Sequence, residues 1–281
     1  MTAALSSDND ESIAHMASRT LEPVTAGTVP ALALSARGIE KTYFETSPPT
    51  TVLGGIHLNV RVGEFVAVMG ASGSGKSTLL YCISGMDRPT AGSISLGGRE
   101  LTGLNNREMS RVRLTEMGFI FQQAHFLSNL SVRDNVLLPA LKATPTDRHE
   151  VEVRVDALLR RFELDHIGNH GITQVSGGQL QRASICRALA TQPTVLFADE
   201  PTGALNASAT EEVMNAIDEV HRDGTTIVMV THDPSCAAHA DRVVYLRDGV
   251  ILDDRMLGQW REEDRAERAD ALLEWLRGLG F

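Results

Sequence analysis

The sequence predicts an α/β fold in which a parallel sheet is covered by helices on both faces and a mostly helical segment is inserted into it. Short apolar runs closed by polar residues lie at 65–70, 194–199 and 226–233, as expected of strands buried on both sides. Helical spacing of apolar residues alternates with these runs, which favours a parallel sheet. The stretch at about 101–180 is more polar and mostly helical in its periodicity.

The chain divides into three predicted parts. Residues 1–30 are rich in Ala, Ser, Thr and acidic residues without periodicity, so we expect a disordered tail. Residues 31–252 carry all the motifs described below and form one domain, which includes the helical subdomain at about 101–180. Residues 253–281 are expected to form a C-terminal amphipathic helix that docks on this domain, with contact to a partner as the alternative.

Composition excludes several classes of protein. A net charge of −10 over 281 residues argues against a general nucleic-acid-binding surface, so we expect no nucleic-acid partner. The three scattered cysteines form no paired framework and favour a reducing, cytoplasmic location. The first twenty residues lack the pattern of a secretory signal, and no stretch approaches about 18 continuous apolar residues. We therefore expect attachment to a membrane only through a partner.

The stretch GASGSGKST at 70–78 fits the phosphate-loop pattern G-x-x-x-x-G-K-[ST]. Its glycines let successive N–H groups point at an anion, and the helix that follows adds the positive end of its dipole. Lys76 would neutralise β- and γ-phosphate oxygens, and the Ser77 hydroxyl would bind Mg²⁺. The predicted ATP-binding residues here are Gly70, Ala71, Ser72, Gly73, Ser74, Gly75, Lys76, Ser77 and Thr78.

Polar residues close the other buried runs, and the carboxyl ends of parallel strands meet at one edge of a sheet. Asp199 can hold Mg²⁺ there, which leaves Glu200 free to act as general base on a water. His232 can donate to a γ-phosphate oxygen, and Gln122 offers an amide oxygen to the metal. Taken alone, each has a plainer interpretation: the acidic pair as solvated charges and the histidine as a structural residue. Tyr43 can stack on adenine, although a bare aromatic more often packs in a core.

A second phosphate-facing helix start lies in QVSGGQLQR, where Ser176 is a good N-cap and Gly177 and Gly178 leave room for an oxyanion. A second site for the chain's own nucleotide should lie near the phosphate loop, but this stretch lies at the far end of the helical insertion. It could face outward, towards an anion presented by another molecule. A second copy docked head to tail would bring its ATP there, so Ser176, Gly177, Gly178 and Gln179 are predicted to bind ATP in trans.

Six motifs in order, KTYF, GASGSGKST, FIFQQ, VSGGQLQR, VLFADEPTGALN and VTHD, resemble those of ATP-binding cassette (ABC) transporter ATPases over about residues 31–252. The resemblance implies a P-loop NTPase (RecA-like) core with a parallel or mixed sheet and an inserted α-helical subdomain. It also implies an ATP-dependent homodimer or pseudo-dimer. It supports Tyr43 for adenine stacking, Ser77, Gln122 and Asp199 for Mg²⁺, and Lys76, Glu200 and His232 for catalysis. The sequence departs from the pattern at Val175 and Asn206, where leucine and aspartate are usual.

Within that superfamily, the sequence looks most like the branch that serves macrolide efflux, lipoprotein release and antimicrobial-peptide resistance. In that branch the ATPase is a separate chain that works with membrane permeases. The resemblance implies an ATPase that powers such a permease from the cytoplasmic face of the membrane. The alternatives are an ABC ATPase without a transporter and a non-hydrolysing regulatory subunit that binds nucleotide.

Overall fold

The computed structural model describes residues 31–144 and 147–281. The tail predicted at 1–30 lies outside the described residues. The strands are β1 (Leu32–Tyr43), β2 (Thr50–Arg61), β3 (Phe65–Met69), β4 (Ala91–Leu96), β5 (Arg99–Glu100), β6 (Met117–Phe121), β7 (Val195–Asp199), β8 (Thr226–Val230), β9 (Arg242–Arg247) and β10 (Val250–Met256). The α-helices are α1 (Lys76–Ile83), α2 (Asn106–Glu116), α3 (Val132–Ala143), α4 (Arg148–Arg161), α5 (Gly177–Leu189), α6 (Ala207–Arg222), α7 (Pro234–Ala237) and α8 (Arg265–Gly278). Single 3₁₀ turns are η1 (Asp165–Ile167), η2 (Ile172–Gln174) and η3 (Glu262–Asp264).

The central sheet has the strand order β10-β9-β3-β8-β7-β6 and is parallel except for β10. All residues of β3, β7 and β8 are buried, which explains their continuous apolar sequences. In β3, Phe65 and Ala67 face one core and Val66 and Val68 face the other, as the alternation of strand side chains requires. The carboxyl ends of β3, β7 and β8 therefore form one edge, where Gly70, Glu200 and Thr231 follow the strands.

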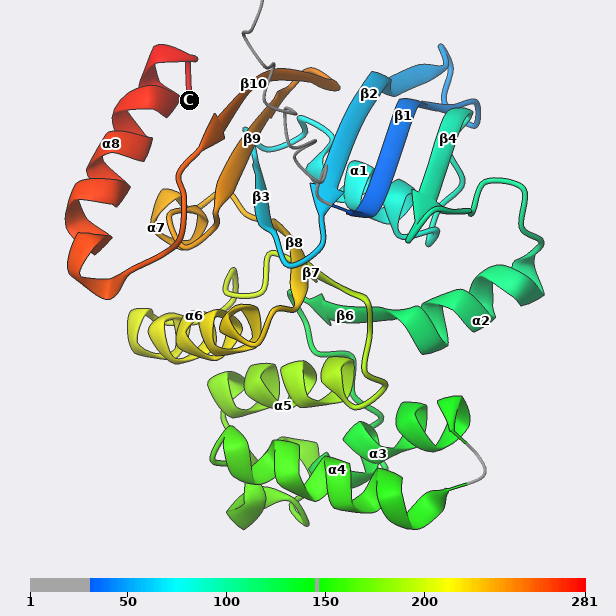
Figure 1. The fold of residues 1–281 in the computed structure, drawn as a ribbon, viewed down its shortest axis with the longest axis vertical. Helices are drawn as coiled ribbons and strands as arrows, with labels where there is room; N and C mark the ends of the chain where they lie inside the picture. Colours follow the sequence, from blue (N-terminus) through cyan, green and yellow to red (C-terminus); the bar gives the residue numbers. More distant parts are fainter. Residues whose placement is uncertain (1–30, 145–146) are drawn as a thin grey trace, which may run out of the picture. The chain divides into compact units, whose positions relative to one another are not determined.

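A second, antiparallel sheet has the order β2-β1-β4-β5. Its apolar face and helix α1 share one core cluster with one face of the central sheet, and α1 lies beside β1, β2 and β4 in Figure 1. The loop between β1 and β2 is short, because β2 begins at Thr50, which pairs with Tyr43. Tyr43 is the last residue of β1.

Helices α3, α4 and α5 are grouped together at the bottom of Figure 1, and α5 also packs against α6 and β6. Helices α3 and α4 lie within the region 101–180 that is predicted to be a helical subdomain, whereas α5 begins near its end and runs on to Leu189. Strand β6 lies in the same region but pairs with β7 in the central sheet. The helical region is therefore divided by a strand of the core sheet, which brings Phe121 directly beside Asp199.

The C-terminal helix α8 docks on the domain. Leu272 and Leu276 are both 0% exposed within the larger core cluster, and Trp275 Nε1 donates to Asp253 Oδ2 at 3.0 Å. The helix begins at Arg265, later than the predicted 253, because residues up to 256 pair with β9 as part of β10. None of the helices in the described residues combines the length and apolar character needed to cross a membrane.

Candidate functional site

The phosphate loop connects β3 to α1 and lines a cavity of about 660 Å³, which we call the phosphate-loop cavity. Glycine is required at Gly70, because a Cβ there would lie 2.1 Å from the Leu246 carbonyl oxygen. It is also favoured at Gly75, the N-cap of α1, where φ is 102°. The rest of the cavity wall is formed by Val52, Ala71, Ser72, Gly73, Lys76, Ser77, Thr78, Glu200, His232 and Phe281.

Lys76 is 6% exposed, and its Nζ donates to the carbonyl oxygens of Gly70 and Ala71, each at 2.9 Å. Burial lowers the pKa of the Lys76 ammonium, while the charges of Glu200 and Asp199 act in the opposite direction. The ammonium is thus folded back onto its own loop, within the cavity where a phosphate would lie. An arriving phosphate group would compete with neutral carbonyls for this ammonium and would be favoured by its charge.

Asp199, at the end of β7, is 8% exposed and has a hydroxyl on each carboxylate oxygen. Ser77 Oγ donates to Oδ1 at 2.9 Å, and the Tyr81 hydroxyl donates to Oδ2 at 2.7 Å. The two residues predicted from separate motifs, Ser77 and Asp199, are therefore in direct contact. Their oxygens are the kind of ligand that Mg²⁺ takes.

Glu200 and His232 follow the neighbouring strands β7 and β8, and both line the phosphate-loop cavity. Glu200 Oε2 lies 3.1 Å from His232 Nδ1. Glu200 adopts a left-handed backbone with φ 45°, which costs free energy for a residue with a Cβ and is common at functional sites. Its N–H donates to the Val230 carbonyl at 2.9 Å, so the sheet holds it in this conformation.

Gln122 follows β6 and is exposed. A Cβ built on Gly203 would lie 2.9 Å from Gln122 Nε2 and 3.2 Å from Glu200 Oε2, so both side chains approach the same backbone position. Gln122 is therefore near Glu200, whereas it is not among the described residues that line the phosphate-loop cavity. Its role as a metal ligand stays a prediction.

Tyr43 does not line the phosphate-loop cavity but lies in a polar network at the end of β1. Its hydroxyl donates to Asp87 Oδ2 at 3.2 Å, and Lys41 Nζ lies 4.8 Å above its ring. Lys41 Nζ also donates to Asp87 Oδ1 at 2.7 Å. Tyr43 is thus held by the ion pair of Lys41 and Asp87. The stacking of Tyr43 on adenine stays a prediction.

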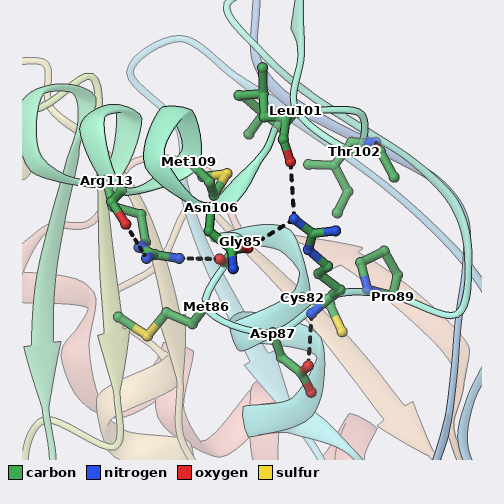
Figure 2. A pocket seen from close by; sticks show the side chains of 14 residues that line it. Cys82, Gly85, Met86, Asp87, Pro89, Leu101, Thr102, Asn106, Met109 and Arg113 are labelled. Carbon is green, nitrogen blue, oxygen red and sulfur yellow. Dashed lines mark hydrogen bonds between the residues drawn. The ribbon is translucent and has the colours of Figure 1, made fainter.

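Asp87 also lines a second cavity, of about 570 Å³, between the carboxyl end of α1, β4 and α2. Figure 2 shows Arg113 donating to the Gly85 carbonyl and Asp87 accepting from the backbone at the opposite side. Met86 and Met109 line the same cavity. This cavity is separate in its lining from the phosphate-loop cavity.

The second helix start is well formed. Ser176 is the N-cap of α5, and Gln179 Oε1 accepts from Ser176 N at 2.9 Å, which completes a capping box. Ser176 and Gly177 are exposed, whereas Gly178 is buried with its Cβ position 3.0 Å from Ala209 Cβ. None of the four residues predicted to act in trans lines the phosphate-loop cavity of the same chain.

Residues 53–203, more than half of the chain, match the family described as "ABC transporter". The chain belongs to the ABC transporter family. The matched segment contains the phosphate loop, Gln122, the start of α5 and the pair Asp199 and Glu200. The resemblance in the motifs and the predicted fold class are thereby confirmed.

This ABC cassette is similar to the macrolide export ATP-binding/permease protein MacB of Rhodopseudomonas palustris (strain BisB18), at 45% identity over 219 residues, which are 78% of this chain and 33% of that protein. MacB of Shewanella sp. (strain ANA-3) is 45% identical over 204 residues, 73% of this chain and 31% of that protein. The chain thus spans about a third of the length of these relatives.

Solved ABC cassettes share the fold. The dimeric structure of MJ0796, a bacterial ABC transporter cassette, has a TM-score of 0.74 at 35% identity and covers 81% of this chain and 100% of its own. A dimeric post-hydrolysis state of MJ0796 bound to ADP and Pi has a TM-score of 0.73 at 34% identity, with the same coverage. Both of these solved structures are dimers, and one of them is bound to ADP and Pi.

Asn206, where the family pattern usually has aspartate, has a local role that aspartate would also have. Asn206 is the N-cap of α6, and its Oδ1 accepts from Ala209 N at 2.9 Å. The other departure, Val175, is half-buried and packs against the larger core cluster. The fold therefore uses Asn206 as a helix cap and Val175 in the packing of its core.

Two residues of the ABC site were missed from the sequence. Tyr81 donates to Asp199, and Phe281 lines the phosphate-loop cavity. Tyr81 lies four residues after Ser77 on α1, so helical spacing was the available signal. No sequence pattern indicated that Phe281 would line the cavity, because its position depends on the docking of α8. In this docking, Arg247 Nη1 donates to the Leu279 carbonyl at 2.9 Å.

Proposed function

We propose that the chain binds and hydrolyses ATP, and that two copies close around two ATP molecules to power a separate membrane permease. The observation that carries this proposal is that the phosphate loop, Glu200 and His232 line one cavity of about 660 Å³. A phosphate cradle with a carboxylate and an imidazole opposite is what hydrolysis of a terminal phosphate requires.

In the proposed reaction, Lys76 leaves the carbonyl oxygens of the loop and binds phosphate oxygens. Glu200 orients a water and takes its proton as the water oxygen bonds to the γ-phosphorus. The bond from that phosphorus to the bridging oxygen breaks, and ADP and phosphate remain. His232, 3.1 Å from Glu200, holds the carboxylate in place and has its second ring nitrogen free to meet a phosphate oxygen.

The residues of the metal site fit Mg²⁺. Asp199 and Ser77 present hard oxygen atoms in contact with each other, and Gln122 can add an amide oxygen. When bound, Mg²⁺ would neutralise phosphate charge and so stabilise the charge that develops in the reaction. Cofactors of the proposed activity are accordingly ATP and Mg²⁺.

The dimer follows from the exposed Ser176 and Gly177, which form an anion site that the chain's own cavity does not use. Leu127, five residues after Gln122, is 50% exposed. Its neighbour Phe126 packs against the core, and Arg187 Cζ lies 4.6 Å from the centroid of its ring. We place the permease contact at Leu127, so that closure around ATP shifts the membrane partner at the cytoplasmic face. MacB, named as an ATP-binding/permease protein, supports this partner class.

The test compares Glu200→Gln with Glu263→Gln, an exposed glutamate in η3. Glu200→Gln should lower the steady-state ATPase rate by about 100-fold or more and should give an ATP-dependent dimer in light scattering. Glu263→Gln should hydrolyse ATP as the wild type does. A wild-type protein that binds ATP but never hydrolyses it, alone or with candidate permeases in liposomes, would establish the regulatory alternative instead.

A further inference from the structure

Tyr81 is the second hydroxyl on the carboxylate of Asp199. Ser77 and Tyr81 are one helical turn apart on α1 and lie on the same face. Ser77 Oγ donates to Oδ1 at 2.9 Å and Tyr81 donates to Oδ2 at 2.7 Å, so each oxygen of this buried carboxylate has its own donor. One helix therefore fixes both the position and the rotation of the carboxylate.

We propose that Tyr81 is a positioning residue that holds Asp199 ready for a divalent cation. This inference rests on the proposed function, in which Ser77 gives its hydroxyl oxygen to the cation. The Ser77 hydroxyl is then engaged by the cation. The Tyr81 hydroxyl remains as the hydrogen-bond donor that orients the Asp199 carboxylate. Hydrogen-bond partners of metal-binding carboxylates commonly change metal affinity by about 10- to 100-fold when removed.

Tyr81 lies outside the wall of the proposed nucleotide site. Tyr81 is not among the described residues that line the phosphate-loop cavity, whereas Lys76, Ser77 and Thr78 of the same helix are. Removing the Tyr81 hydroxyl should therefore leave the contacts to phosphate unchanged and should alter only what the cation adds. The plainer interpretation is that Tyr81 only packs against the core cluster around α1, which its ring also contacts.

The experiment uses the full chain in a Glu200→Gln background, so that no nucleotide is consumed. The dissociation constant of a fluorescent ATP analogue is measured with excess Mg²⁺ and with EDTA. The constant in EDTA divided by the constant in Mg²⁺ gives the contribution of the cation. Tyr81→Phe should lower this ratio about 10-fold, with the constant in EDTA unchanged within about twofold. Tyr245→Phe, at a buried tyrosine of β9 that packs against Trp275, is the matched control and should leave the ratio unchanged.

An unchanged ratio in folded Tyr81→Phe, with its thermal unfolding like that of Tyr245→Phe, would overturn the proposal and leave Tyr81 as a packing residue. Equal weakening in Mg²⁺ and in EDTA would also overturn it, because the effect would then lie in the phosphate loop. If the background protein itself shows no Mg²⁺-dependent binding of the analogue, the proposed function fails, which is a different result from either.

Discussion

The Glu200 carboxylate lies 3.1 Å from the Nδ1 atom of His232, at the carboxyl ends of two adjacent parallel strands. Because β7 and β8 are hydrogen-bonded along their length, the two side chains are placed by the sheet itself rather than by a flexible loop. The Glu200 N–H continues this pairing to Val230, which fixes the left-handed backbone of Glu200. The carboxylate proposed as general base thus has a rigid support.

Replacing His232 by alanine should lower kcat by about 100-fold with a smaller change in the KM for ATP, because the imidazole holds the proposed base and not the bulk of the nucleotide. The measurement is steady-state hydrolysis over a range of ATP concentrations. His57→Ala, at an exposed histidine of β2, should behave as the wild type. A kcat unchanged in His232→Ala would remove this histidine from the reaction.

Cysteines placed at positions 72 and 176 should form a crosslink between two different chains when ATP and Mg²⁺ are added to the Glu200→Gln protein. The three native cysteines need not be replaced, because each is buried and burial raises the pKa of each thiol to about 12. The product is read on a denaturing gel. Mixing two proteins that each carry only one of the two introduced cysteines separates crosslinks between chains from those within one chain. A crosslink that forms equally well without nucleotide would contradict closure around ATP.

Leu272→Ala in α8 should lower the free energy of unfolding by about 2–5 kcal/mol, because it removes a side chain that is 0% exposed in the core. Denaturant unfolding measures this loss. Leu138→Ala is the control at a leucine that is 49% exposed, and should change stability by about 0.5 kcal/mol or less. Equal effects of the two substitutions would mean that α8 is not docked in solution.

The stability contributed by His221 should depend on pH. Burial alone lowers the pKa of His221, but the hydrogen bond and charge of Asp241, 3.0 Å away, outweigh it and the net pKa is raised above 6.5. A raised pKa in the folded state stabilises the protein below the unfolded pKa, and this contribution is lost as pH rises through the folded pKa. His221→Gln should thus destabilise the protein more at about pH 5.5 than at about pH 8.5. Unfolding curves at both pH values test this, and equal losses would refute it; exposed His57→Gln is the control.

The sequence motifs predicted that the phosphate loop, Glu200 and His232 lie together, for a physical reason. A phosphate loop, a buried strand ending in Asp199 and another ending before His232 are local patterns, and parallel pairing then brings the strand ends together. Local patterns do not report which side chains meet across the fold. Tyr81 and Asp199 are 118 positions apart, and their contact depends on how α1 lies over β7.

The residues at which helices and strands begin and end were harder to predict from the sequence than the existence of these elements. The helix of the C-terminal region begins at Arg265 because β10 first completes its pairing with β9, and this competition is invisible in amphipathic spacing alone. Likewise, the network of Lys41, Asp87 and Tyr43 joins strand β1 to the loop after α1, and no single window of sequence contains it. Tertiary pairing decided these positions.

Phe281 has a practical consequence for handling the protein. Phe281 lies in the wall of the phosphate-loop cavity, so a bulky fluorophore attached at this position would lie beside the proposed nucleotide. Such a label would crowd the surface on which a second cassette is expected to close, and labelled and unlabelled preparations should be compared in every kinetic measurement.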